Sequence, residues 1–275
     1  MTVAPSRRAA LVCGLMVALA GCHRPVQQQH PAPRHDATTA TATAGRADLP
    51  PLALLTALPI VFGEGFSLDS PPHPAMAALA EHYHVRPVDG PDELARDGLL
   101  LAAQPRALTA ERLVALDRWV RNGGRMLLLA DPYLAWPSDR TLGDRLRPPF
   151  AFDDTGLIAH WGLTLTAPAD AAPVRATIAG HAVQLIAPGT LSASSTACQV
   201  SDNGLRAECR IGRGRVTVIA DADWLQVAQA DEPANLAALT AILGQLAVAS
   251  ESRTDLSTTK PSVVKTGTTP TDRTP

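Results

Sequence analysis

Residues 98–132 read GLLLAAQPRALTAERLVALDRWVRNGGRMLLLADP, and this stretch decides the fold class. The first apolar run stops at Pro105, as a buried strand does where it meets a residue without an N–H donor. Thr109 is a suitable N-cap for the segment that follows, in which apolar residues recur at helical spacing. Gly123 and Gly124 end that helix, and a second apolar run begins directly after them. Strand, helix and strand in this order predict a parallel β-α-β unit.

The rest of the chain extends the same pattern. We expect two hairpins, one turning at Gly180 and one at the SDNG sequence of residues 201–204. The fold class is therefore α/β: a mostly parallel open sheet flanked by helices, with an inserted β-hairpin region. Further strands are expected over 52–62, 85–88 and 213–221, and further helices over 73–84, 153–162 and 231–248.

Composition shifts divide the chain of 275 residues into one folded domain and polar flanks. Residues 1–21 are interpreted as a signal peptide, 22–50 as a flexible tether, 51–249 as the α/β domain and 250–275 as a disordered tail. Hydrophobic residues make up 46% of the chain, enough for a large core, and the formal net charge is −2. That balance gives no reason to expect nucleic acid as a partner.

The N-terminus resembles the signal of a bacterial lipoprotein. Arg7 and Arg8 precede an apolar run that, at about 12 residues, is too short to span a hydrocarbon core about 30 Å thick. The sequence Leu-Ala-Gly-Cys ends at Cys22 and resembles a lipobox, which implies cleavage before Cys22 and acylation of its thiol. The chain is then anchored by lipid on the periplasmic side of the cell envelope. The absence of Asp after Cys22 favours the outer membrane.

Two cysteines of the expected domain flank the SDNG turn. With a two-residue loop, Cys198 and Cys209 lie directly opposite each other, and exported proteins keep disulfides, so we predict a bridge between them. A two-residue loop places this pair in a hydrogen-bonded site, whereas a four-residue loop removes that complication, so the sequence leaves the turn type open. A redox pair or half of a zinc site are the alternatives.

Aspartates follow two of the apolar runs, as Asp131 and as Asp221 with Asp223. Ligands of open α/β sheets bind at the carboxyl ends of strands, so these acids are candidates for a ligand contact, a Mg²⁺ site or an acid/base pair. The favoured interpretation is structural, because Asp after a strand commonly accepts backbone N–H bonds in the next turn. The sequence contains neither a nucleophile elbow nor a phosphate-binding P-loop.

Together, Trp-Val-x-x-Gly-Gly before a strand ending in Asp-Pro, and Gly-x-Gly-Arg-Val-x-Val-Ile-x-Asp before an Asn-Leu helix, resemble a known family. It is the auxiliary domain of uncharacterised ABC-type transport systems, related to gliding-motility auxiliary proteins. The match covers residues 98–132 and 210–243. The resemblance implies a fold similar to class I glutamine amidotransferases, or flavodoxin-like, and an ABC transporter permease or another envelope protein as partner. It transfers no catalytic residues, and its members usually carry transmembrane helices or a neighbouring permease.

The sequence thus predicts a lipid-anchored, extracytoplasmic, non-catalytic auxiliary or binding module, with no cofactor and no metal. A divergent metal-dependent hydrolase that uses the strand-end aspartates is the alternative, and a purely structural envelope protein is a third possibility. A ligand or protein would bind at the carboxyl edge of the sheet. The residues expected to line that site are Glu64, Asp131, Tyr133, Trp136, Asp221, Asp223 and Trp224.

Overall fold

The computed structural model describes residues 49–65, 71–227 and 233–248. All of them belong to one compact unit, Ala42–Pro275. The predicted signal peptide 1–21, Cys22, the tether up to residue 48 and the tail 250–275 lie outside the described residues. Within the described residues, no helix combines the length and the apolar character needed to cross a bilayer.

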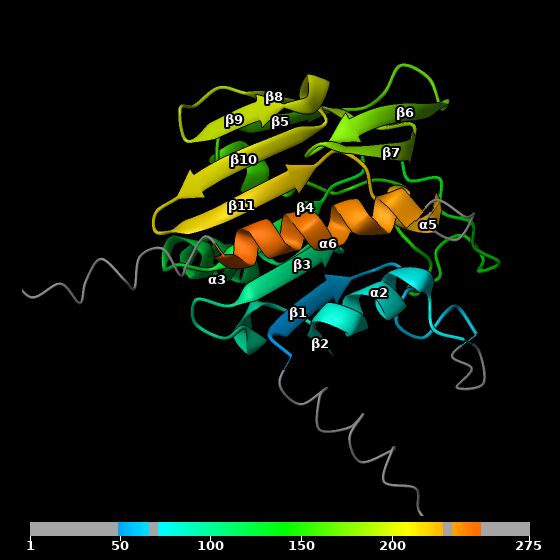
Figure 1. The fold of residues 1–275 in the computed structure, drawn as a ribbon, viewed down its shortest axis with the longest axis horizontal. Coiled ribbons are helices and arrows are strands. Elements are labelled where there is room, and N and C mark those ends of the chain that lie inside the picture. Colours follow the sequence, from blue (N-terminus) through cyan, green and yellow to red (C-terminus); the bar gives the residue numbers. More distant parts are fainter. Residues whose placement is uncertain (1–48, 66–70, 228–232, 249–275) are drawn as a thin grey trace, which may run out of the picture. The chain divides into compact units, whose positions relative to one another are not determined.

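A seven-stranded sheet forms the centre of the fold, in the order β2-β1-β3-β4-β11-β10-β9 (Figure 1). The strands from β2 to β11 all run parallel, and β10 and β9 are antiparallel to their neighbours. The predicted, mostly parallel sheet is therefore confirmed. The strands are β1 (Pro51–Thr56), β2 (His84–Pro87), β3 (Leu99–Ala103), β4 (Arg125–Leu129), β9 (Cys198–Ser201), β10 (Arg206–Ile211) and β11 (Gly214–Ile219).

The unit β3-α3-β4 forms as the sequence predicts. The Thr109 hydroxyl accepts a hydrogen bond from the Arg112 N–H at the start of α3 (Ala110–Arg121). Gly123 follows the helix with φ of 118°, a conformation that favours glycine. A Cβ at Gly123 would lie 2.1 Å from Asp97 Oδ1, so any larger residue would also displace that side chain.

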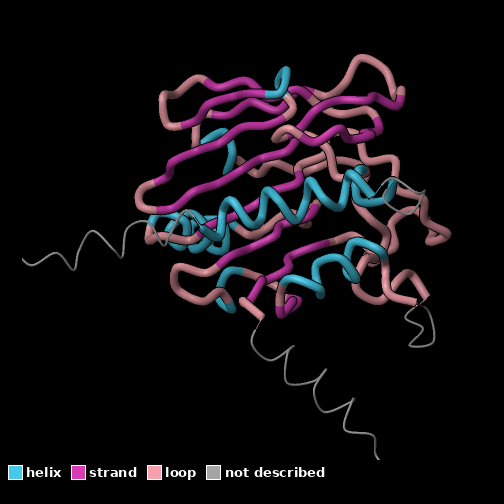
Figure 2. Tube along the Cα trace, viewed as in Figure 1, coloured by secondary structure: helices cyan, strands magenta, loops and turns pink. Residues whose placement is uncertain are grey.

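Helices cover both faces of the parallel strands, and two apolar cores result (Figures 1 and 2). Helices α2 (Pro74–His82), α5 (Trp224–Val227) and α6 (Pro233–Val248) lie on one side, whereas α3 and α4 (Leu157–His160) lie on the other. Every residue of β3 is buried, as expected for a parallel strand covered on both faces. The long apolar runs of the sequence are thus explained by their double burial.

The chain between β4 and β11 contains the inserted hairpin region. Strands β6 (Pro173–Ile178) and β7 (His181–Ile186) form the predicted hairpin around Gly180, and β5 (Leu163–Thr166) pairs with β8 (Thr190–Ala193). Two 3₁₀ turns, η1 (Pro91–Glu93) and η2 (Asp202–Gly204), complete the described elements.

Some predicted elements are too long. The predicted strand over 52–62 ends at Thr56, because the Thr56 hydroxyl accepts the Leu58 N–H in a turn that Pro59 then continues. The predicted helix within 153–162 is a single turn, α4, since the Asp154 carboxylate binds the Ile158 N–H at its start.

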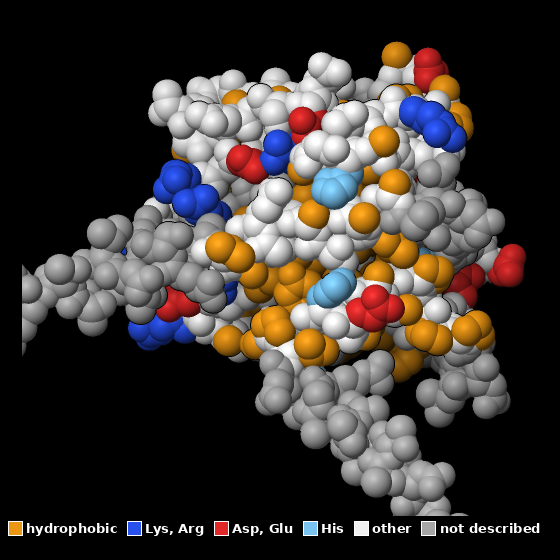
Figure 3. Space-filling view, viewed as in Figure 1, with side chains coloured by type: hydrophobic (Ala, Val, Ile, Leu, Met, Phe, Trp, Pro, Cys, Tyr) orange, Lys and Arg blue, Asp and Glu red, His pale blue; other side chains and the backbone are white. Residues whose placement is uncertain are grey.

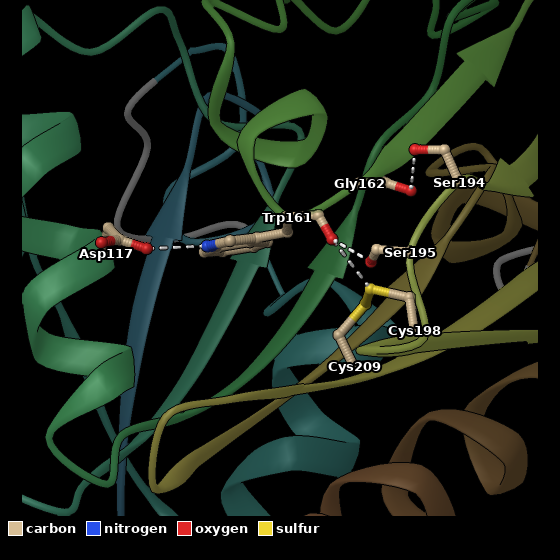
Figure 4. Close-up of a disulfide and its surroundings, with 7 residues drawn as sticks. All are labelled: Asp117, Trp161, Gly162, Ser194, Ser195, Cys198 and Cys209. Carbon is tan, nitrogen blue, oxygen red and sulfur yellow. Dashed lines mark hydrogen bonds between the residues drawn. A yellow bond between two sulfur atoms is a disulfide. The ribbon is translucent and has the colours of Figure 1, made fainter.

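The predicted disulfide between Cys198 and Cys209 is present, and the two residues are direct cross-strand partners. Pairing ends at Ser201 and Arg206, so the loop has the four residues 202–205 and not two. Figure 4 shows Trp161 beside this bridge. The Trp161 indole N–H donates to Asp117 Oδ1 on α3 (2.8 Å). The disulfide hairpin is thereby connected to the helix layer.

Candidate functional site

The carboxyl edge of the parallel strands brings the predicted acidic residues together. Asp131 follows β4, and Asp221 and Asp223 follow β11, its parallel neighbour. All three side chains are fully buried. A buried carboxylate needs hydrogen-bond donors, so its partners show what it does.

Asp131 connects the ends of β4 and β11. Its Oδ1 accepts the N–H of Tyr133 (2.8 Å), and its Oδ2 accepts the N–H groups of Ala222 (3.0 Å) and Asp223 (3.4 Å). The side chain thus shapes its own turn and holds the turn of the neighbouring strand.

The other two acids connect more distant segments. Asp221 accepts the Trp224 N–H at Oδ1 (2.8 Å) and the Ile186 N–H at Oδ2 (3.0 Å), which fixes β7 to the end of β11. Asp223 Oδ2 accepts the Ala135 N–H (2.6 Å), whereas its buried Oδ1 has no hydrogen-bond partner. Each carboxylate therefore serves as an acceptor for backbone N–H groups.

Burial raises the pKa of all three carboxyl groups. It is the main cause of the raised pKa of Asp131, which its backbone hydrogen bonds partly offset. Burial and the nearby charge of Asp131 raise the pKa of Asp221 well above its ordinary value. Burial, opposed by the Ala135 hydrogen bond, raises the pKa of Asp223 to about 7. The cluster holds protons more tightly than free aspartates do.

Residues 133–152 form a loop over this edge, and several side chains hold it in place. The His73 ring stacks on Trp136 with centroids 5.7 Å apart, and its Nδ1 accepts the Ala75 N–H at the start of α2. Burial lowers the pKa of His73 to about 4, so this ring is neutral at pH 7. Glu64 Oε2 accepts the Asp139 N–H (3.0 Å).

The seven residues expected to line a ligand site thus differ in exposure. Asp131, Asp221, Asp223 and Trp224 are fully buried, and Trp136 is 9% exposed. Tyr133 is half exposed, and Glu64 is partly buried. A ligand at the carboxylates of Asp131 or Asp221 would have to replace their backbone partners. Within the described residues, no group of three or more His, Cys, Asp or Glu side chains is arranged to hold a metal ion.

Two further polar side chains complete the edge, and their role was not predicted from the sequence. The buried Gln104 forms a pair of hydrogen bonds with the backbone N–H and C=O of Asp131 (2.8 and 3.0 Å). Asn235 does the same with Gln184 and also donates to Trp224 O. The only sequence feature that could have indicated this role of Gln104 is its position between an apolar run and a proline.

The family model described as "Domain of unknown function (DUF4350)" matches residues 66–243. The chain belongs to the DUF4350 family. The matched region of this DUF4350 protein contains α2, the β3-α3-β4 unit, both hairpins and most of α6. No curated protein matches the chain.

Several solved structures resemble this DUF4350 chain. One is the exo-β-1,4-mannosidase Op5Man5 from Opitutaceae bacterium strain TAV5, with 16% identity, a TM-score of 0.43 and coverage of 73% of this chain and 37% of the mannosidase. Another is the mmIFT52 N-terminal domain (13%, TM-score 0.45, 71% and 95% coverage). A third is a catalytic mutant of the GH42 β-galactosidase Gan42B from G. stearothermophilus (15%, 0.42, 70% and 33%). The chain spans about a third of the length of both glycosidases.

Proposed function

We propose that this protein is a lipid-anchored, extracytoplasmic, non-catalytic module that binds another envelope protein, as an auxiliary component of an ABC-type transport system. One observation carries the proposal. The strand-end acids are buried acceptors of backbone N–H bonds, while the loop beside them exposes large apolar side chains. The edge is therefore better suited to present a docking surface than to perform acid/base or metal chemistry.

The exposed apolar side chains lie on an ordered loop. Leu142 is 77% exposed, and Leu146, Phe150 and Tyr133 are each exposed by half or more. Arg147 braces the loop from within: its guanidinium donates to the carbonyls of Ser138 and Arg140 and lies over the Phe150 ring. Apolar side chains held in a fixed position at the surface are typical of protein-interaction sites.

Anchoring and transport rest on the sequence. Arg7, Arg8 and the lipobox ending at Cys22 support export and acylation. The strand order β2-β1-β3-β4-β11 corresponds to the flavodoxin-like order 2-1-3-4-5, which supports the amidotransferase-like class implied by the family resemblance. The same resemblance supports association with a transporter permease.

Site-specific photo-crosslinking in cells tests the proposal. A photoreactive residue at Leu142 or Phe150 is expected to capture a specific envelope protein, identified by mass spectrometry as a transporter subunit. The matched control position is Val114, which is 57% exposed on α3, outside the loop. Equal capture from all three positions, or capture from none, would contradict docking through the loop. Capture of a protein unrelated to transport would contradict the transporter assignment alone.

The hydrolase alternative predicts a different result. If Asp131, Asp221 and Asp223 held a metal, then Mg²⁺ or Mn²⁺ would raise the melting temperature of the protein, and Asp221→Asn would abolish that rise. We expect no metal-dependent stabilisation, because five of the six carboxylate oxygens of these residues already accept backbone N–H groups.

A further inference from the structure

A groove separate from the carboxyl edge lies between α6 and the outer strands β9, β10 and β11. Helix α6 packs on β3, β4 and β7, and in Figure 1 no helix lies in front of β9 and β10. The groove has a volume of about 470 Å³, within the range of small-molecule sites. Its polar lining includes Gln199, Glu208, Arg210, Arg215, Thr217 and Gln245.

Two arginines face each other on the floor of this groove. Arg210 on β10 and Arg215 on β11 are direct partners in the antiparallel register, so their side chains project from the same face with Cβ atoms about 5 Å apart. Like charges at such positions destabilise a sheet. Within the described residues, neither guanidinium has a hydrogen-bond or ion-pair partner. By contrast Arg125, the next residue in this row, donates to Ala247 O and Asp97 O.

Nearby acids neutralise the pair only in part. Arg206 binds both of the acids close to it, Asp202 through Nε (2.7 Å) and Glu208 through Nη1. The side chains of Arg206, Asp202 and Glu208 carry a net charge of −1. Together with Arg210 and Arg215, the group has a net charge of +1. Figure 3 shows basic side chains gathered over the neighbouring ends of β10 and β11. The repulsion between the two facing guanidinium groups costs stability in the free protein. An anion bound between them would offset this repulsion.

We propose that this groove binds a small organic anion, whose carboxylate or phosphate group lies between the guanidinium groups of Arg210 and Arg215. Guanidinium groups bind planar and tetrahedral oxyanions through paired hydrogen bonds. The side-chain amides of Gln199 and Gln245 and the hydroxyl of Thr217 supply donors and acceptors for hydroxyl groups on the rest of the ligand. This site is separate from the carboxyl edge and does not depend on the docking function proposed above.

Isothermal titration calorimetry of the full chain in detergent, at constant ionic strength, tests the site. The probes are inorganic phosphate, glucose 6-phosphate, glucuronate and, as the neutral comparison, glucose. We expect at least one of the anions to bind and glucose not to bind. Arg210→Gln and Arg215→Gln are each expected to weaken binding roughly tenfold or more. Arg118→Gln removes the same charge from the exposed side of α3 and should bind like the wild type.

A melting curve separates loss of the site from loss of the fold. The bound anion should raise the melting temperature of the wild type and of Arg118→Gln, but not that of Arg210→Gln or Arg215→Gln, which should still unfold cooperatively. The relative affinities for glucose 6-phosphate and glucuronate show whether phosphate or carboxylate is preferred. Three results would overturn the proposal: no binding of any anion, equal binding by the groove variants and Arg118→Gln, or binding of glucose as tight as that of glucuronate.

Discussion

Replacing Asp131 by Ala removes the acceptor that joins the ends of β4 and β11. Two of its three donors, the N–H groups of Ala222 and Asp223, are buried and would lose this partner. Each buried orphan donor costs about 1–3 kcal/mol. Part of this cost is offset, because the variant no longer buries a carboxylate whose pKa burial raises. The net loss of unfolding free energy should be about 2–4 kcal/mol.

Urea unfolding followed by circular dichroism measures this loss. The midpoint should fall with an unchanged slope, and the melting temperature should fall by roughly 5–15 °C for a domain of this size. Asp153→Ala is the matched control, because Asp153 is exposed and should change stability by no more than about 0.5 kcal/mol. If Asp131→Ala were as stable as Asp153→Ala, Asp131 would not be the structural acceptor described above.

Four further outcomes follow from the structure and the sequence. Asp223→Asn should be more stable than the wild type at pH 8 and equal to it near pH 4, as measured by urea unfolding; a constant difference would contradict the raised pKa. Replacing Cys198 and Cys209 together by Ala should cost about 3 kcal/mol by chain entropy, and an unchanged midpoint would refute this. Cys22→Ser should release the protein from the membrane fraction in cell fractionation. Leu142→Ser should leave the melting temperature within about 2 °C of wild type, because the side chain is 77% exposed. The same substitution should abolish crosslinking from a photoreactive residue at Phe150.

The pH prediction for Asp223 follows from linkage. The folded state has a pKa of about 7, against an ordinary value of 3.8, so it binds the proton more tightly than the unfolded state does. The resulting stability is complete below about pH 4, falls as the pH rises, and is lost once the pH passes 7. An Asn at this position does not ionise, and its oxygen can still accept the Ala135 N–H. The variant therefore avoids the loss.

The sequence predicts those parts of the fold that depend on local or doubly buried patterns. The apolar runs of β3 and β4, the Thr109 cap and the Gly123 stop are local signals, and the structure confirms them. The disulfide between Cys198 and Cys209 was predictable because a hairpin makes its partners countable along the chain.

The parts that the sequence could not predict depend on contacts between distant segments. Nothing in the sequence around Asp221 indicates that its carboxylate binds the Ile186 N–H, 35 residues away. Gln104 belongs to the same class, since its partner Asp131 lies 27 residues further along the chain. The facing pair of Arg210 and Arg215 was not predicted for another reason. Whether the two side chains line a groove depends on which strands α6 leaves uncovered.

Amide hydrogen exchange at the carboxyl edge tests the central claim most directly. The amides of Ala222, Trp224 and Ile186 donate to the carboxylates of Asp131 and Asp221, so in the metal-free protein they should exchange only through global unfolding. Their exchange rates should then report the same free energy as the urea transition. Rapid exchange of these three amides that slows only when a divalent cation is added would contradict a structural role for the strand-end acids.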